Sequence, residues 1–277
     1  MRVGFVGLGS QGGPMARRIV DAGHPTTLWA RRPETLAAFA DTPARIAASP
    51  ADLAAHSDLV CVCVVDDAGV EEIVTAVLEG SAPGSVIAIH STVHPDTCRR
   101  VAERSAAHGV QVIDAPVTGG GPAAAQGTLL VMVGGDPEPV ERCRPVFSTY
   151  ADRVVHLGNL GSGQVTKLLN NALFTANLGT AAGALALGRS LGVDPRRLAE
   201  VICGGSGASF ALERVAAAGA TLERIATHAG PLLTKDVRLL TSLAGAAGAQ
   251  TGIVGQAADA ALSMMDAQLS TMDRAPK

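Results

Sequence analysis

The stretch Val3-Gly-Phe-Val-Gly-Leu-Gly-Ser-Gln-Gly-Gly13 decides the fold: a short apolar run ends in a cluster of glycines. Residues of helical character follow to about Ala22. The glycines form the pattern G-x-G-x-x-G at a predicted strand-to-helix junction, where they permit a tight turn, close approach of a pyrophosphate and close packing of the helix on the strand. The amino end of the helix then faces the anion. The stretch predicts a dinucleotide site formed by Gly7, Leu8, Gly9, Ser10, Gln11 and Gly12.

The second predicted strand, residues 26–30, bears on the choice of dinucleotide. An acidic residue about 20 positions past the glycines holds an unsubstituted ribose in NAD-binding proteins. This chain has Arg31 and Arg32 there instead. Two guanidinium groups fit a 2′-phosphate, to which arginine offers a fork of donors. The pair favours NADP over NAD, although a surface loop with two solvated arginines would look the same.

Strand-like and helix-like segments alternate as far as residue 158. Leu59–Val65 is an apolar run of the buried parallel type. Further strand-like runs cover residues 86–89, 110–113, 129–133 and 154–155. This alternation predicts an α/β doubly wound sheet, mainly parallel, whose binding sites lie outside the carboxyl ends of the strands. Val65 ends one of these runs, and Ser91, Thr92 and the loop that begins at Asp114 follow others.

The composition changes at about Gly158, after which strand patterns stop and small apolar residues dominate. We therefore expect two domains: residues 1–158 bind the dinucleotide, and residues 159–277 form an all-helical substrate and oligomerisation domain. A long helix over about 161–188 joins them. The helices of residues 159–277 have apolar, weakly charged faces that a partner could cover, which favours a homodimer or homotetramer.

Composition excludes several classes of function. The 277-residue chain has a net charge of −3 and contains no basic run or stripe, so nucleic acid and anionic membrane surfaces are not expected partners. No uninterrupted apolar run has the length of a membrane span. Its five scattered cysteines do not form a disulfide framework or a metal site. No signal-peptide pattern is visible, so we expect a cytoplasmic protein with reduced thiols.

A catalytic candidate lies at the head of the long helix, in Gly161-Ser-Gly-Gln-Val-Thr-Lys-Leu-Leu-Asn-Asn171. Lys167 and Asn171 are four residues apart and therefore share one helix face. The flanking glycines allow a ligand or other backbone to come close. A lysine beside an amide, enclosed by apolar neighbours, makes a pocket with one movable proton. The alternative is a solvated lysine on a helix surface.

Four ordered segments together resemble the β-hydroxyacid dehydrogenase family, which includes 3-hydroxyisobutyrate dehydrogenases and tartronate semialdehyde reductases. The amino-terminal glycine stretch is similar to the family's cofactor fingerprint, and Asp114-Ala-Pro-Val-Thr-Gly-Gly120 is similar to its substrate loop. Gly161-x-Gly163-x-x-x-Lys167-x-x-x-Asn171 resembles its catalytic motif, and Lys235-Asp236-x-x-Leu239 resembles its late lysine motif. The resemblance covers nearly the whole chain.

The resemblance implies a role for each of these positions. Lys167 would be the general acid/base, and Asn171 would orient the substrate hydroxyl or the lysine. Thr92 and Lys235 would contact the cofactor, near its ribose and at its nicotinamide end. The substrate carboxylate would be bound by Thr118, Gly119 and Gly120, with Ser91 close by.

The chemistry needs such a lysine independently. When hydride leaves a carbinol carbon for nicotinamide, the hydroxyl must lose a proton, and a lysine can accept it only when neutral. Its ordinary pKa, near 10.4, keeps it charged at neutral pH, and partial burial would lower that pKa. In the reductive direction the protonated lysine donates to the forming alkoxide.

Three rival readings remain open at this stage. Imine reductases share the architecture but usually carry another residue, often aspartate or tyrosine, at the lysine position. A dehydrogenase-like fold can also serve in binding without turnover. The 6-phosphogluconate dehydrogenases have a much larger helical domain than the roughly 120 residues that follow Gly158 here.

Overall fold

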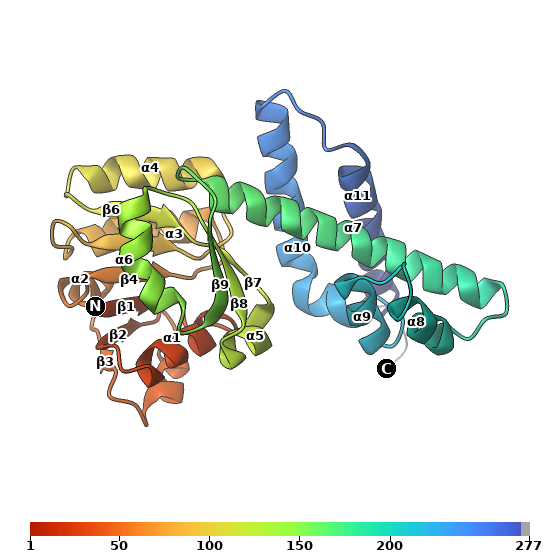
Figure 1. Ribbon diagram of the computed structural model, residues 1–277, viewed down its shortest axis with the longest axis horizontal. Helices are drawn as coiled ribbons and strands as arrows, with labels where there is room; N and C mark the ends of the chain where they lie inside the picture. Colours follow the sequence, from red (N-terminus) through yellow and green to blue (C-terminus); the bar gives the residue numbers. More distant parts are fainter. Residues whose placement is uncertain (273–277) are drawn as a thin grey trace. The chain divides into compact units, whose positions relative to one another are not determined.

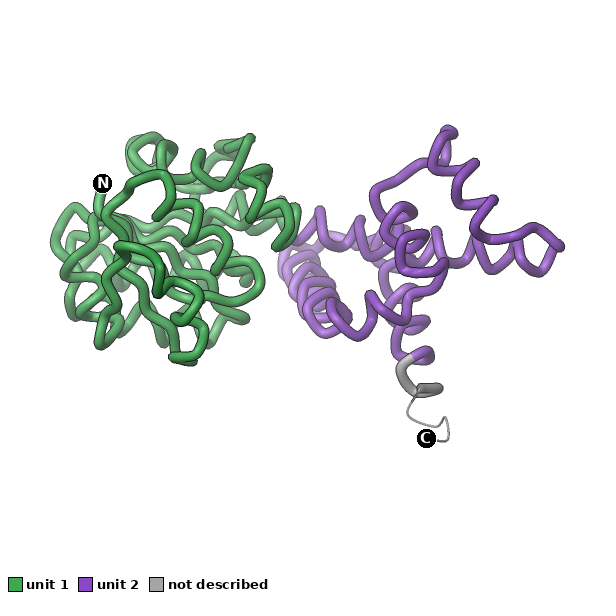
Figure 2. The backbone as a smooth tube through the Cα atoms, turned by 90° about the horizontal axis from the view of Figure 1, so that it is seen from below, with its two compact units in different colours: residues 1–167 green, residues 168–277 purple. Residues whose placement is uncertain are grey.

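The computed structural model describes residues 1–272. The chain divides into two compact units, Met1–Lys167 and Leu168–Lys277 (Figure 2). Helix α7, Ser162–Ser190, contains the boundary between them.

The first unit is built on a six-stranded, all-parallel sheet with the order β3-β2-β1-β4-β5-β6 (Figure 1). From β1 the chain runs outward through β2 to β3, then returns to β4 on the other side of β1 and continues outward to β6. This path makes the sheet doubly wound, as the alternation of segments predicts. The strands are β1 Val3–Val6, β2 Thr26–Trp29, β3 Arg45–Ile46, β4 Leu59–Val62, β5 Val86–Ile89 and β6 Gln111–Asp114.

Alternate residues of the central strands supply two separate cores, because successive side chains of a strand point to opposite faces. On one face, Phe5 and Cys61 pack with Met15 of α1 and with residues of α6. On the other face, Val60 and Val62 belong to the core formed with α2, α3 and α4. Both faces are covered, which explains the unbroken apolar character of these strands.

The helices that cover the sheet begin where the sequence signals them. Ser49 accepts a hydrogen bond from the backbone N–H of Asp52, and Asp66 accepts one from Gly69, so both cap a helix amino end. Proline at the first position opens α2, α4 and α6. The covering helices are α1 Gly12–Asp21, α2 Pro50–Ala55, α3 Asp67–Leu78, α4 Pro95–Ala106 and α6 Pro137–Phe147, and a 3₁₀ segment covers Pro33–Phe39.

A second, three-stranded sheet differs from the sequence prediction. We expected residues 129–133 and 154–155 to extend the main sheet. They lie instead in a sheet of order β7-β8-β9, in which β7 Val117–Thr118 pairs antiparallel with β8 Leu129–Val133, and β8 pairs parallel with β9 Ala151–His156. Asp114 and Gly134 form an isolated bridge between β6 and the end of β8. The short helix α5, Gly120–Gln126, connects β7 to β8.

Within residues 168–272 the second unit consists of helices joined by loops, as the loss of strand patterns predicts. Its core gathers Leu178 and Leu185 of α7, Leu212 of α9, Leu233 of α10 and Met265 of α11. No helix within residues 1–272 has the length and apolar character needed to cross a membrane. The helices after α7 are α8 Pro195–Cys203, α9 Phe210–Ala217, α10 Glu223–Ala246 and α11 Gly252–Met272.

Candidate active site

The three glycines of the amino-terminal loop are glycines for different reasons. Gly7 has φ of +95°, and a Cβ there would overlap the carbonyl oxygen of Cys63. A Cβ at Gly12 would overlap the carbonyl oxygen of Gly7, so this glycine lets α1 pack against the turn. A Cβ at Gly9, by contrast, would meet no protein atom within 4 Å. The protein's own packing therefore explains Gly7 and Gly12 but leaves open space at Gly9.

That open space fits a bound dinucleotide. The N-cap residue of α1, Gln11, makes no side-chain cap, and the first turn of this helix carries no acidic residue. The backbone N–H of Gly13 donates to the carbonyl oxygen of Gly9, and Pro14 has no N–H, so what the helix offers an anion is its dipole and the absence of an opposing charge. Ser10 is exposed and Leu8 is buried, so the loop offers its backbone and a hydroxyl to a ligand on its outer side.

The residues predicted to lie at the adenosine end are exposed. Arg31 forms an ion pair with Glu72 of α3, with 2.6 Å between Nη2 and Oε2, and both side chains are about two-thirds exposed. Arg32 is the N-cap residue of the 3₁₀ segment and is also exposed. Val65, after β4, has 67% of its surface exposed, so it is available to a ligand.

The loop after β5 is fixed on its buried side. The backbone N–H of Val64 donates to Ser91 Oγ at 2.8 Å, and Ser91 is 3% exposed. His90, which precedes it, is buried against Phe5, and its Nδ1 lies 2.7 Å from the carbonyl oxygen of Ala115. Burial lowers the pKa of His90 to about 4, so the ring is neutral at physiological pH. Thr92 is partly exposed, as a ligand-contacting residue of this loop would have to be.

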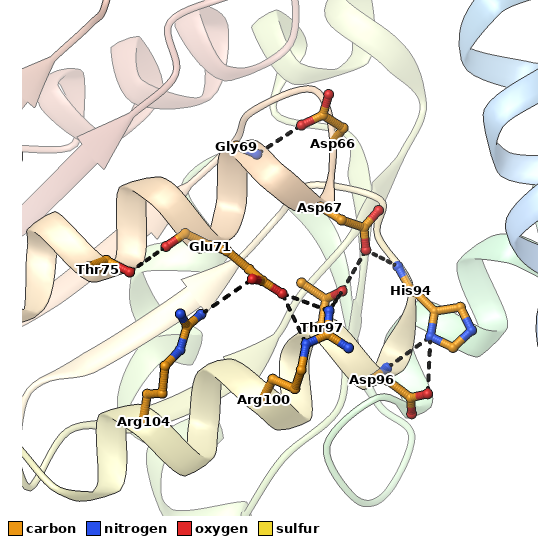
Figure 3. A network of polar contacts seen from close by, with 10 residues as sticks. All are labelled: Asp66, Asp67, Gly69, Glu71, Thr75, His94, Asp96, Thr97, Arg100 and Arg104. Atoms are coloured by element: carbon orange, nitrogen blue, oxygen red, sulfur yellow. Dashed lines mark hydrogen bonds and ion pairs between the residues drawn. The ribbon is translucent and has the colours of Figure 1, made fainter.

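A polar network on α3 and α4 holds the far end of the same loop (Figure 3). Asp67 Oδ1 accepts two hydrogen bonds, from the backbone N–H of His94 at 2.8 Å and from Thr97 Oγ1 at 2.6 Å. Glu71, one turn along α3, accepts from Arg100 of α4 at 2.6 Å. The network fastens the amino end of α4, and with it the loop that carries Thr92, to α3.

Asp114 organises the head of α7. Its Oδ1 accepts from the backbone N–H of Gly161, and its Oδ2 accepts from that of Gln164, both at 2.7 Å. Burial raises the pKa of this carboxyl, while the backbone hydrogen bonds oppose the shift. Gly163 allows the close approach, because a Cβ there would overlap the carbonyl oxygen of Met132. Asp114, the first residue of the predicted substrate loop, is therefore a structural anchor for the helix.

Lys167 lies one helical turn beyond this anchor and is buried, with 9% of its surface exposed. A solvated surface lysine, the alternative that the sequence left open, is not what the structure shows. Thr118 ends β7 and is partly exposed, and Gly119 and Gly120, with φ of +127° and +76°, follow it into α5. These positive φ angles require glycine. A Cβ at Gly121, the next residue, would crowd the carbonyl oxygen of Ser10, so the start of α5 touches the dinucleotide loop.

In the second unit, Asn171 and Lys235 are both bound to Asp236. Asp236 is 4% exposed, and its Oδ2 accepts from Asn171 Nδ2 at 2.6 Å. Its Oδ1 lies 2.8 Å from Lys235 Nζ. Lys235 also lines a groove between α10 and α11, together with Arg238. One buried carboxylate therefore fixes two of the predicted functional residues of this unit.

Sequence reasoning missed four side chains that the structure places among the predicted ones: Glu72, Asp67, Gln164 and Asp236. For Asp236, the neighbouring lysine motif was a usable signal. The other three lie on helices at positions that no local pattern distinguishes. Their partners are distant in sequence, so only the tertiary structure reveals them.

Comparison with known proteins places the chain in a family. Residues 2–158 match the family described as the NAD binding domain of 6-phosphogluconate dehydrogenase. Residues 161–275 match the family described as NAD-binding of NADP-dependent 3-hydroxyisobutyrate dehydrogenase. The chain belongs to the β-hydroxyacid dehydrogenase family. It is thus an NAD(P)-binding oxidoreductase of the hydroxyacid dehydrogenase type, as its four motifs predict.

Individual relatives agree with this assignment. An uncharacterised oxidoreductase of Mycobacterium tuberculosis is 38% identical over 75% of this chain and 73% of its own length. The 3-hydroxyisobutyrate dehydrogenase of Pseudomonas aeruginosa is 36% identical over 76% and 72%. Among solved structures, Mycobacterium tuberculosis 3-hydroxyisobutyrate dehydrogenase with L-serine superposes with a TM-score of 0.84, at 27% identity and 98% coverage of both chains. The fold is therefore that of the family.

Proposed function

We propose that the protein transfers hydride between NADP(H) and a small β-hydroxy acid or its semialdehyde, with Lys167 as general acid/base. The observation that carries the proposal is the burial of Lys167 on α7, on a segment anchored to the loops that follow β5 and β6. A lysine withheld from bulk water, beside loops that the family uses for cofactor and substrate, has a use in proton transfer.

The chain's own residues would divide the work as follows. Bound nicotinamide supplies the hydride acceptor or donor. Lys167 Nζ takes the hydroxyl proton during oxidation and returns it during reduction. Asn171 orients the same hydroxyl, because its amide is itself fixed by Asp236. Three residues bind the substrate carboxylate: Thr118 through its hydroxyl, and Gly119 and Gly120 through backbone N–H groups. Ser91 supports the substrate site through its place in the loop after β5, because its buried hydroxyl is already bonded to the backbone of Val62 and Val64.

We infer that the cofactor is bound by the residues that the sequence singled out. Gly7, Gly9 and Gly12 hold the pyrophosphate, and Gly9 supplies the open space for it. Thr92 contacts the ribose near the nicotinamide, and Lys235 contacts the nicotinamide end. The remaining contacts come from Leu8, Ser10, Gln11, Val65, Arg31 and Arg32.

NADP is the favoured form of the cofactor, and NAD is the alternative. Two exposed arginines stand where an acidic residue would hold an unsubstituted ribose. The description of the family that matches residues 161–275 names an NADP-dependent enzyme. Arg31 must leave Glu72 to form a fork on a 2′-phosphate, which offsets part of this preference.

The wider setting completes the proposal. We assign most cofactor contacts to residues 1–158, and the substrate-orienting Lys167 and Asn171 together with the oligomer contacts to residues 159–277. Exposed apolar side chains such as Leu187, Leu191, Val201 and Ile253 favour a homodimer or homotetramer.

The five cysteines are free thiols. Burial raises the pKa of Cys63 and Cys143 to about 12 and shifts the pKa of Cys61 and Cys98 upward as well. Unreactive thiols suit the cytoplasm.

A spectrophotometric screen tests the proposal. The purified protein is offered short β-hydroxy acids with NADP⁺ or NAD⁺, and the matching semialdehydes with NADPH or NADH, and the absorbance of the reduced cofactor is followed. We expect turnover with at least one hydroxy acid, faster with NADP(H). A cyclic imine with NADPH belongs in the same screen. Turnover of the imine alone would replace the proposal with an imine reductase, and cofactor binding without turnover of any compound would indicate a binding protein.

A further inference from the structure

The buried side chain of Gln164 joins the helix of Lys167 to the loop of Thr92 through hydrogen bonds to the residues immediately before and after Thr92. Its Nε2 donates to the carbonyl oxygen of Ser91 at 2.8 Å. Its Oε1 accepts from the backbone N–H of Val93 at 3.1 Å. The side chain is fully buried, so both bonds form away from water. The two contacts stand immediately before and after Thr92.

The position of Gln164 on the helix gives these contacts a consequence. Residues three apart lie on the same side of a helix, so Gln164 and Lys167 share one face. The backbone N–H of Gln164 is itself held by Asp114 Oδ2 at 2.7 Å. Its main chain therefore fixes the register of α7, and its side chain fixes the loop.

The other tethers of the loop do not duplicate this link. The backbone N–H of Val64 donates to the Ser91 side chain, which ties the loop to the segment that follows β4. Asp67 accepts from the backbone N–H of His94, which ties the loop to α3 (Figure 3). Neither tether reaches α7. The hydrogen bonds of Gln164 run from α7 to the residues on either side of Thr92 and therefore constrain the distance between Thr92 and Lys167.

We propose that Gln164 is a positioning residue, which sets the register of Lys167 against the loop that contacts the cofactor ribose. The inference rests on the proposed function, since it takes Lys167 as the acid/base and Thr92 as a cofactor contact. Gln164 touches neither the substrate nor the cofactor and acts through the two backbone bonds. Replacing Gln164 should lower kcat more than it weakens cofactor binding, because a displacement of about 1 Å in the position of a reacting group can lower the rate about 10²-fold.

Gln164→Leu is the first test variant, because leucine fills similar space and makes neither hydrogen bond. The matched control is Val77→Ala, which removes buried apolar atoms from α3 in the same unit. Three quantities are measured: amide hydrogen exchange of the peptide covering residues 91–94, the Kd of NADPH by fluorescence titration, and kcat at a temperature where all variants are folded. For Gln164→Leu we expect faster exchange in that peptide, kcat lowered about 10- to 100-fold and Kd changed less than about fivefold.

Gln164→Glu is the second variant, and its effect should depend on pH. A protonated carboxyl can accept from Val93 and donate to Ser91 as the amide does, whereas a carboxylate cannot donate. Burial and the neighbouring Asp114 raise the pKa of a carboxyl introduced here, and the Lys167 amine on the same helix face opposes that shift when it is charged. The ratio of its kcat to that of the wild type should therefore be highest at low pH and fall as pH rises. A residue with only a structural role would leave this ratio flat.

The outcomes separate this inference from the proposed function. If the wild-type protein turns over no substrate, the proposed function fails, and the hydrogen exchange still decides whether Gln164 fixes the loop. If Gln164→Leu keeps wild-type kcat and loop exchange, the inference is overturned while the proposed function stands. If Val77→Ala lowers kcat and speeds loop exchange as much as Gln164→Leu does, the effect is general destabilisation, and the inference is again overturned. Should Gln164→Leu fail to fold, the pH dependence of Gln164→Glu decides.

Discussion

Replacing Asp236 should cost the second unit a measurable part of its stability. The carboxylate is 4% exposed, accepts a 2.6 Å hydrogen bond from Asn171 and lies 2.8 Å from the Lys235 ammonium. A hydrogen bond to a charged group contributes about 1.5–3 kcal/mol, and a buried donor left without a partner costs about 1–3 kcal/mol. Asp236→Ala removes the hydrogen bond to the charged carboxylate and leaves the Asn171 amide partly without a partner, so we expect the free energy of unfolding to fall by about 3 kcal/mol. Asp236→Asn keeps the shape and an acceptor for Asn171, so we expect about 1–2 kcal/mol.

Urea unfolding followed by circular dichroism measures these losses. Asp259→Asn is the control, because Asp259 is an exposed carboxylate on α11 of the same unit, and its substitution should stay within about 0.5 kcal/mol of the wild type. A double-mutant cycle with Asn171→Ala isolates the Asn171–Asp236 term, which we expect at about 1–2 kcal/mol. An Asp236→Ala protein as stable as the control, or a coupling energy near zero, would refute the assigned contacts and with them the fixed orientation of Asn171.

Three further predictions concern the first unit. Gly9→Ala should fold with near-normal stability but bind cofactor at least tenfold more weakly. Gly7→Ala should lose stability, because a Cβ at Gly7 overlaps protein atoms whereas one at Gly9 does not. Thermal unfolding and fluorescence titration distinguish the two variants. Arg31→Ala should weaken the binding of NADPH more than that of NADH. Glu72→Gln should strengthen NADPH binding by a fewfold, since the surface ion pair that holds Arg31 contributes under about 1 kcal/mol. Equal changes in the Kd of both cofactors would count against a 2′-phosphate contact. The pKa of His90 is about 4 in the folded protein and ordinarily 6.5, so unfolding takes up a proton between these pH values. The free energy of unfolding should therefore be highest above about pH 6.5 and fall by up to about 3 kcal/mol as pH falls toward 4. Urea unfolding of His90→Gln should show a shallower decline over that range.

The sequence predicted the fold where local patterns and tertiary structure agree. Apolar runs located five of the six strands of the main sheet, and the run over residues 86–89 matches β5 residue for residue. The two-residue strand β3, Arg45–Ile46, was missed, because both residues are exposed and no apolar run marks them. The second sheet was not predicted as separate, because a strand's pattern does not identify its partner strand. The helix over Gly120–Gln126 was missed as well, since a glycine-rich beginning gives no helical signal.

The candidate site was predictable in its motifs but not in its supports. Glycine loops and the Lys167–Asn171 spacing are visible in the sequence because they serve a local geometry. Gln164 and Asp67 act on backbone groups 71 and 27 residues away. No spacing rule connects such pairs, because the distance between them is set by how the strands and helices pack. The predicted roles of the individual site residues remain predictions for experiment.

The central claim is that the Lys167 amine moves the proton in a hydride transfer between NADP(H) and a small hydroxy acid. The most direct measurement is the kcat of Lys167→Ala on the best substrate of the screen, beside its Kd for NADPH. The account predicts a fall of roughly 10²–10⁴ in kcat, the range expected when a general acid/base is removed, with the Kd nearly unchanged. Wild-type turnover in this variant would contradict it.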